Sequence, residues 1–188
     1  MSLFYKSTRD DSVKVTASQA ILKGLAPDGG LFVPESIPSF DKSLEELSKM
    51  SYKEVAYEVM KLMLDDFTEE ELKACIDKAY DEKFDTDVIA PLVKADGAYY
   101  LELFHGATIA FKDMALSILP HLLITSAKKN DVHNEIVILT ATSGDTGKAA
   151  LAGFADVKGT RIIVFYPRMV SARFRKNRWL HRRVIIHM

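Results

Sequence analysis

The sequence predicts an α/β protein in which strands and helices alternate to build a parallel β-sheet. Two mostly apolar segments, Glu135–Thr140 and Arg161–Tyr166, have the length and composition of buried strands. Residues 144–157 between them have helical spacing, and an alternating segment at Ala98–Phe104 is followed by a helical pattern over 111–129. This order of elements is typical of a parallel sheet that helices cover on both faces. We therefore expect part of a three-layer αβα fold, preceded by an N-terminal segment and a helical subdomain.

The N-terminal segment is expected to contain a short helix, a tight turn and a short strand. Thr16 and Gln19 have the spacing of a capping box, in which each side chain bonds to the backbone amide of the other residue. Gly24 marks the end of this helix, and Pro27–Gly30 must turn tightly because glycine tolerates a positive φ. Leu31–Val33 follows as the predicted strand.

Residues 42–84 are predicted to form the helical subdomain. Two further capping boxes, Ser51 with Glu54 and Thr68 with Glu71, each precede apolar residues at helical spacing. The methionine and aromatic side chains in this span are expected to pack in its core, as their periodicity indicates.

Composition narrows the class of protein. Of the 188 residues, 48% are hydrophobic and 27% are charged, which is typical of a globular chain. The single cysteine, Cys75, excludes an internal disulfide and a cysteine-based zinc site, and His121 and His133 lack metal-ligand spacing. No apolar run has the length of a membrane span, and the first residues lack the apolar stretch of a signal peptide. We expect a cytoplasmic protein with no metal site and no membrane partner.

The first candidate site is the segment Phe104–Asp113, which places Lys112 at a predicted helix start. If its apolar neighbours bury Lys112 in part, the pKa of the ammonium falls and a nucleophilic amine results. The alternative is a surface lysine paired with the adjacent Asp113. His105 in the same segment could be catalytic, but a lone histidine is more often an oriented structural group.

The second candidate site lies between a predicted strand and a predicted helix. It comprises hydroxyl-bearing and small residues whose backbone amides would form an anion site at a helix N-terminus: Ser143, Gly144, Asp145, Thr146 and Gly147. A carboxylate or a phosphate would fit there. A Walker loop is excluded, because Thr142 and Ala149 replace residues that this motif requires. The alternative is an ordinary capping turn in which Thr142, Ser143 or Asp145 bonds the free amides.

Four separated blocks between Leu3 and Pro167 together carry a resemblance to a known family. They are STR near the start, KGLAPDGGLFVPE, LELFHGATIAFKD and ATSGDTGKAAL, in this order. The chain resembles the threonine synthases, which are pyridoxal 5′-phosphate enzymes of fold type II. The resemblance implies conversion of O-phosphohomoserine and water to L-threonine and phosphate, by γ-elimination and β-addition.

The resemblance also assigns roles to the two candidate sites. The lysine of the family's FKD motif, here Lys112, forms a Schiff base with the cofactor, and Phe111 and Asp113 flank it as cofactor-binding residues. After the substrate amine displaces Lys112, the freed lysine would move protons at the substrate carbons. The turn 143–147 would hold the substrate carboxylate. One departure is Ala107, where the family usually carries proline, and we expect it only to loosen the loop slightly.

The last residues differ from the rest of the chain. Residues 168–188 contain seven Lys or Arg and no acidic residue, whereas residues 1–167 contain 18 basic and 26 acidic residues. The resemblance also stops after Pro167. Restoring one adenine after the Pro167 codon, with suitable synonymous codons, yields KNGVSEIQKKQMVTQEGDNTH, which resembles the family's continuation. We therefore expect three parts: 1–97, 98–167 as the start of the pyridoxal-phosphate domain, and 168–188 as a frameshifted tail.

If this interpretation holds, the chain as given is an incomplete and inactive fragment. In the family, the glycine-rich loop for the cofactor phosphate and the group facing the pyridine nitrogen come later in the chain. Two alternatives stay open at this point. One is another pyridoxal-phosphate lyase of the serine or threonine dehydratase type. The other is a non-catalytic fragment whose tail, with Phe174 and Trp179, binds nucleic acid, although no nucleic-acid partner is expected.

Overall fold

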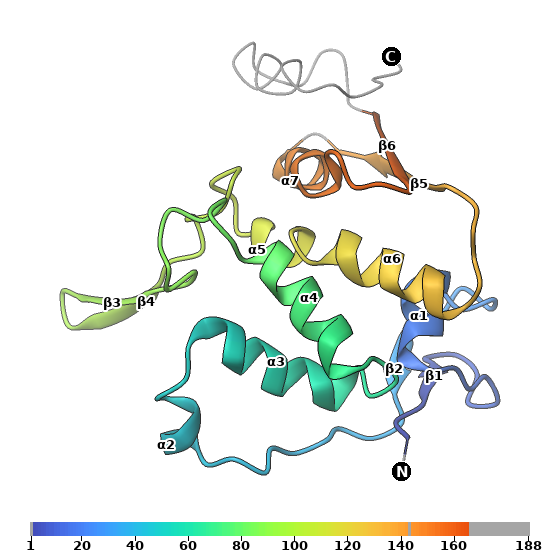
Figure 1. Ribbon diagram of the computed structural model, residues 1–188, viewed down its shortest axis with the longest axis horizontal. Helices are drawn as coiled ribbons and strands as arrows, with labels where there is room; N and C mark the ends of the chain where they lie inside the picture. Colours follow the sequence, from blue (N-terminus) through green and yellow to red (C-terminus); the bar gives the residue numbers. More distant parts are fainter. Residues whose placement is uncertain (1, 143, 166–188) are drawn as a thin grey trace. The chain divides into compact units, whose positions relative to one another are not determined.

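The computed structural model describes residues 2–142 and 144–165 (Figure 1). These residues form two compact units, 2–78 with 121–133, and 79–120 with 134–142 and 144–165. The predicted division at residues 97 and 167 is a division along the sequence and stays a prediction. The predicted basic tail, 168–188, lies outside the described residues.

The first unit begins with two short antiparallel strands, β1 (Tyr5–Ser7) and β2 (Phe32–Pro34). The predicted strand at 31–33 is confirmed with a shift of one residue. Its partner β1 was not predicted, because three residues are too few to show an alternating pattern. Between the strands lies α1 (Ala17–Lys23), which begins with the predicted capping box of Thr16 and Gln19.

The tight turn between α1 and β2 is confirmed, and it is held by one carboxylate. Asp28 accepts hydrogen bonds from the backbone N–H of Gly30 and the hydroxyl of Ser7, each at 2.8 Å. The Gly30 amide, and then the Ser7 hydroxyl, lower the pKa of Asp28. Gly29 has a φ of 76°, and a Cβ on Gly30 would lie 2.2 Å from Ser7 Oγ. Both glycines are therefore required by the geometry of the turn.

The predicted helical subdomain is confirmed as three helices, α2 (Leu44–Leu47), α3 (Tyr52–Met63) and α4 (Glu69–Ala79). Both predicted capping boxes are present. Ser51 Oγ accepts from the backbone N–H of Glu54 at 3.3 Å, and Thr68 Oγ1 accepts from that of Glu71 at 3.2 Å. In each pair the glutamate side chain bonds back to the first residue's amide.

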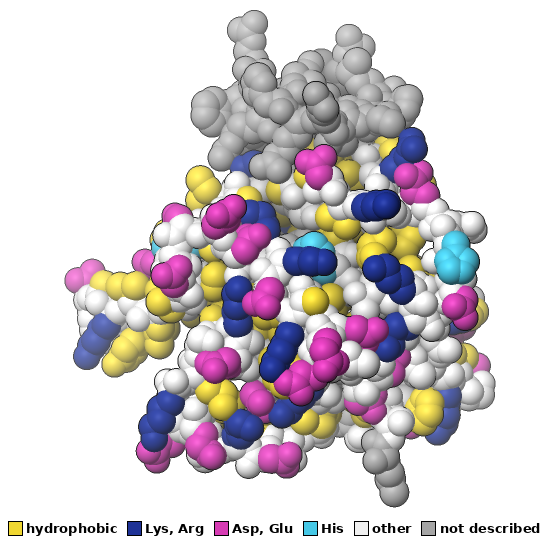
Figure 2. All heavy atoms as spheres, viewed as in Figure 1, with side chains coloured by type: hydrophobic (Ala, Val, Ile, Leu, Met, Phe, Trp, Pro, Cys, Tyr) yellow, Lys and Arg dark blue, Asp and Glu magenta, His cyan; other side chains and the backbone are white. Residues whose placement is uncertain are grey.

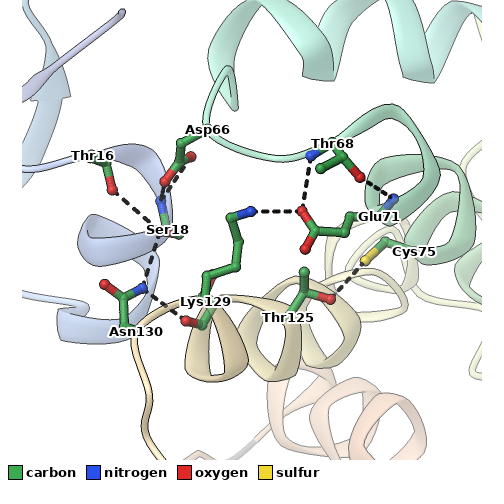
Figure 3. Close-up of polar contacts among 10 residues, drawn as sticks. Thr16, Ser18, Asp66, Thr68, Glu71, Cys75, Thr125, Lys129 and Asn130 are labelled. Atoms are coloured by element: carbon green, nitrogen blue, oxygen red, sulfur yellow. Dashed lines mark hydrogen bonds and ion pairs between the residues drawn. The ribbon is translucent and has the colours of Figure 1, made fainter.

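Polar contacts connect distant segments of the first unit through α6 (Leu119–Lys129) and the residue after it (Figure 3). Asn130 Nδ2 donates to Ser18 Oγ at 3.1 Å, and Lys129 Nζ lies 2.8 Å from a Glu71 carboxylate oxygen. Ser18 is also fixed by Asp66, whose carboxylate accepts from the Ser18 amide. These bonds lie beside an apolar core: Ala17, Ala20, Leu72, Cys75, Ile76, Leu123 and Ala127.

The second unit contains a hairpin that corrects one prediction. The strand expected at 98–104 in the parallel sheet is instead β4 (Ala98–Leu101), which pairs antiparallel with β3 (Leu92–Ala95). The two turn residues, Asp96 and Gly97, have φ values of 49° and 77°. A two-residue turn with both φ values positive folds the chain back on itself and makes the pair antiparallel.

The apolar side chains of this hairpin lie exposed on the surface (Figure 2). They belong to Leu92, Val93, Tyr99, Tyr100 and Leu101. The parallel strands expose apolar side chains as well: Val137, Leu139 and Phe165. Parallel sheets are normally covered on both faces, and exposed apolar strand faces favour aggregation.

The predicted alternation of strand, helix and strand is confirmed by β5 (Ile136–Ala141), α7 (Asp145–Phe154) and β6 (Thr160–Phe165). The strands pair in parallel, with Ile138 opposite Ile162 (Figure 1). Each strand is displaced by one residue from its prediction, and the helix ends three residues earlier than expected. The α/β class with a parallel strand pair is thus confirmed.

The helix expected over 111–129 is broken into α5 (Asp113–Leu116) and α6. In a continuous helix, residue 120 would donate its amide to the carbonyl of Leu116. Pro120 has no amide hydrogen, and its ring would clash with that carbonyl. The Leu116 oxygen instead approaches Gly153 of α7, where an added Cβ would lie only 2.0 Å from it. Among the helices of the described residues, none has the length and apolarity needed to cross a membrane.

Candidate functional site

Two loops of the second unit contain the predicted site residues. We call residues 104–112 the lysine loop, which leads into α5, and residues 143–147 the SGDTG turn, whose residues 145–147 are the first three of α7. The SGDTG turn follows the carboxyl end of β5, where the Thr142 amide donates to the Phe165 carbonyl at 2.9 Å. Ligands of α/β proteins commonly bind at the carboxyl ends of parallel strands.

Lys112 is the last residue before α5 and is half-buried, as its apolar neighbours predict. Its Nζ lies 4.9 Å from the centre of the Phe111 ring, which is itself 59% exposed. Within the part of the chain that the structure describes, the Lys112 ammonium has no hydrogen bond and no ion pair. The amine is therefore held beside an aromatic face without a competing carboxylate.

Asp113 does not pair with Lys112, so the alternative of a lysine–aspartate pair at the helix start is wrong. The Asp113 carboxylate accepts from the backbone N–H of Thr108 at 2.7 Å and from the Thr108 hydroxyl at 2.6 Å. Asp113 is 3% exposed and Thr108 is 4% exposed. A Cβ on Gly106 would lie 2.6 Å from the Asp113 Cβ, so the loop passes close to the carboxylate. The carboxylate thus organises the loop, while its predicted contact with a cofactor stays a prediction.

Lys148 connects the two loops, and sequence reasoning did not select it. Its Nζ donates to the backbone carbonyl of Thr108 at 2.8 Å. Lys148 follows the SGDTG turn directly, but nothing in its local pattern distinguishes it from a surface lysine. The bond spans 40 positions of sequence, so only the packing of α7 beside α5 brings its partners together.

The SGDTG turn provides the start of a ten-residue helix. Gly144 is its N-cap, and among the described residues no side chain caps the helix there, although Thr142 Oγ1 accepts from the Gly144 amide at 3.2 Å. Asp145 and Thr146 are exposed, and Ser143 lies outside the described residues. A Cβ on Gly147 would lie 2.1 Å from Thr142 Cγ2. The glycine thus allows the helix start to approach the strand end, where its amides favour an anion.

His105 is an oriented structural group, as a lone histidine usually is. Its Nε2 lies 2.9 Å from Glu102 Oε2, and its Nδ1 contacts an Asp85 carboxylate oxygen. The hydrogen bond to Glu102, and then the one to Asp85, raise the pKa of His105 above its ordinary value. Both ring nitrogens are occupied, so neither is directed at a substrate.

The raised pKa of His105 predicts a pH-dependent stability. Protonated His105 stabilises the fold fully below its unfolded pKa of about 6.5, and this contribution is lost as the pH rises through the higher folded value. Replacing Glu102 by glutamine removes the larger cause, so the His105 pKa should fall. NMR titration of the His105 ring in the native and Glu102→Gln chains measures the difference. Glu82→Gln, an exposed glutamate in the same unit, is the control and should leave the titration unchanged; equal titrations in all three chains would refute the assignment.

No group of three or more His, Cys, Asp or Glu side chains in the described ranges could hold a metal ion. The candidate site comprises Lys112, the loop before it and the start of α7.

The chain is similar to one family of proteins. Residues 4–80 match the family model described as "Threonine synthase N terminus". Threonine synthase of Saccharomyces cerevisiae is 35% identical over 182 residues, covering 88% of this chain and 35% of the relative. Threonine synthase of Pseudomonas aeruginosa is 38% identical over 169 residues, covering 87% of this chain and 35% of the relative. Human threonine synthase-like 2 is 35% identical over 169 residues, covering 88% of this chain and 34% of that protein.

Solved structures give the same result. The crystal structure of pyridoxal-phosphate-bound threonine synthase from Brucella melitensis matches with a TM-score of 0.83 and 32% identity, covering 94% of this chain and 38% of that one. Yeast threonine synthase matches with a TM-score of 0.85 and 32% identity, covering 93% of this chain and 37% of that one. The chain spans little more than a third of the length of these relatives. It is similar in sequence and structure to their N-terminal portion.

Proposed function

We propose that this chain is the N-terminal portion of a threonine synthase, and that it contributes the lysine and the substrate-carboxylate loop of a pyridoxal 5′-phosphate site. One observation carries the proposal. The lysine loop and the SGDTG turn, predicted separately from sequence, belong to one compact unit and are joined by the Lys148–Thr108 hydrogen bond. The same fold occurs in a threonine synthase that was solved with pyridoxal phosphate bound.

The residues present fit such a cofactor. A half-buried lysine without an ion pair among the described residues can react with an aldehyde, since its nitrogen is not engaged by a carboxylate. The start of α7, which no side chain of the described residues caps, offers backbone amides to an anionic group. Pyridoxal phosphate, when bound, supplies an electron sink for charge that develops on the substrate carbon beside the carboxylate.

The chain's own residues then have distinct roles. Lys112 Nζ would take up and return protons at the substrate carbons, acting as acid and base in turn. The amides of residues 143–147 would hold the substrate carboxylate and so fix the orientation of its reacting bonds. Phe111 covers one side of the lysine side chain. We propose O-phosphohomoserine as the substrate, with release of phosphate and addition of water to give L-threonine.

We propose that the tail, 168–188, results from a frameshift and that the complete protein acts in the cytoplasm. The frameshift is supported by the codon argument, together with alignments to curated relatives that cover 87–90% of this chain. The cytoplasmic location is supported by the single cysteine, which suits a reducing compartment. Resequencing the DNA from the Pro167 codon to the stop tests it. An additional adenine is expected; its absence would mean that the gene encodes the basic tail.

Turnover measurements test the activity. The 188-residue chain is expected to release no measurable phosphate from O-phosphohomoserine, because it spans little more than a third of its relatives. The product of the restored reading frame is expected to release it and to form L-threonine. L-serine and L-threonine are the control substrates. If the restored product deaminates them and leaves O-phosphohomoserine intact, it is a dehydratase and the proposed function is wrong.

A further inference from the structure

The geometry points to Lys148 as a positioning residue. Together with Asp113 it clamps Thr108, and this clamp fixes the lysine loop, and Lys112 with it, against α7. The clamp itself stands on the contacts of the described residues, and only its consequence for the cofactor rests on the proposed function.

The clamp uses all of the polar groups of one buried residue. The backbone N–H and the hydroxyl of Thr108 both donate to Asp113, and its carbonyl accepts from Lys148. Thr108 is therefore fixed from two directions, by the carboxylate of the first residue of α5 and by a cation of α7. Hydrogen bonds to charged groups are stronger than neutral ones, especially away from water.

A strained residue directly follows the clamped one. Ile109 has a φ of 63°, which is unusual for a β-branched side chain, and that side chain is 63% exposed. Its backbone N–H donates to the Gly106 carbonyl at 3.0 Å. Strained backbone persists where its surroundings hold it, and such positions cluster at functional sites. The clamp on Thr108 is the adjacent contact that holds this conformation, three residues before Lys112.

Lys112 lies midway between two attachments to α7. Four residues before it, Thr108 bonds to Lys148; four residues after it, Leu116 packs its carbonyl against Gly153. The α7 side of the first attachment is itself tightly packed, because Gly147 contacts Thr142 and Val164. The segment that bears Lys112 is thus held to α7 at both ends, and loss of Lys148 releases only one end.

Hydrogen exchange of the full chain tests the clamp without any cofactor. In Lys148→Met, the amides of Thr108 and Ile109, which donate to Asp113 and Gly106, are expected to exchange about tenfold faster, the scale of losing one charge-assisted hydrogen bond. The amides of β5 and β6 should exchange at the native rate, which separates local release from global unfolding. Lys158→Met, an exposed lysine beyond α7, is the matched control, and Lys148→Arg should restore most of the protection. Unchanged exchange at Thr108 and Ile109 in Lys148→Met would overturn the clamp.

Covalent trapping tests the positioning of Lys112. Pyridoxal 5′-phosphate is added to the complete protein, the product of the restored reading frame, where a lysine amine condenses with its aldehyde and releases water. Borohydride then delivers hydride to the C=N bond, and a proton from water completes a stable secondary amine. Trapping at Lys112 is expected to be about tenfold slower in Lys148→Met than in Lys158→Met, and near the native rate in Lys148→Arg.

The outcomes separate the two claims. If native Lys112 is trapped and Lys148→Met traps it at the same rate, Lys148 does not position the lysine. If native Lys112 is not trapped above other lysines, the proposed function is wrong, while hydrogen exchange still decides the clamp. Trapping measured across pH adds a further distinction. A positioning role lowers the rate at every pH with the midpoint of the profile unchanged, whereas a shifted midpoint would show that Lys148 acts on the Lys112 charge instead.

Discussion

Replacing Gly153 by alanine is expected to destabilise the second compact unit by about 3 kcal/mol. The added Cβ would lie 2.0 Å from the Leu116 carbonyl oxygen and 2.9 Å from its carbon. These are backbone atoms, so no side chain can rotate away, and α7 must move from α5. Urea unfolding of the native and Gly153→Ala chains measures the loss directly.

The matched control for this prediction is Gly144→Ala. It makes the same change at the start of α7, where an added Cβ meets nothing within 4 Å. Its effect should stay below about 1 kcal/mol. If Gly153→Ala unfolds at the same urea concentration as the native chain, α5 and α7 are not packed as the structure shows. The Leu116 carbonyl, which precedes the helix break before Pro120, would then not lie against Gly153.

Replacing Asp113 by alanine is expected to cost about 2–4 kcal/mol. The substitution leaves the buried N–H and hydroxyl of Thr108 without their acceptor, and water reaches neither group readily at 4% exposure. The free energy of unfolding, measured in urea, reports the loss. Hydrogen exchange at the Thr108 amide should increase in the same chain, because that amide loses its partner.

Two further variants give the Asp113 prediction its control. Thr108→Val removes only the hydroxyl and keeps the amide bonded to Asp113, so it should cost less than Asp113→Ala. The double variant should cost less than the sum of the single ones, because the two residues share a hydrogen bond. Additive losses would contradict the Asp113–Thr108 contact.

Local signals predicted much of the fold. The capping boxes at Thr16, Ser51 and Thr68 each mark a helix start, because a hydroxyl and a carboxylate or amide three residues apart satisfy free backbone amides. The apolar runs of β5 and β6 are long enough to identify, and the helix between them makes their pairing parallel. The capping boxes and apolar strands depend on residues close together in the sequence, so they can be predicted from it.

Features that depend on distant partners could not be predicted in this way. The strand at Leu92–Ala95 is short and contains a lysine, so its pairing with β4 becomes visible only in the hairpin. The helix break before Pro120 was missed because the apolar pattern continues across it. Lys148 gave no signal, since its partner is a backbone carbonyl 40 residues away.

In the candidate site, too, local features were predicted and contacts between distant residues were not. Lys112 was predicted from its motif, and its half-buried setting agrees with its neighbours. Asp113 does not form the alternative ion pair with Lys112. Its buried carboxylate accepts two hydrogen bonds from Thr108, while Lys112 Nζ lies beside the Phe111 ring. The sequence predicts the residues of the candidate site, and the structure shows which of them contact one another: Asp113 with Thr108, and Thr108 with Lys148.

The central claim is that Lys112 is the amine that binds pyridoxal 5′-phosphate. The most direct measurement is to treat the complete protein, the product of the restored reading frame, with the cofactor, reduce it with borohydride, digest it and locate the modified lysine by mass spectrometry. We predict modification of the peptide that contains Lys112, with other lysines at background and none at position 112 in Lys112→Arg. Label spread over exposed lysines such as Lys158, with Lys112 at background, would contradict the claim.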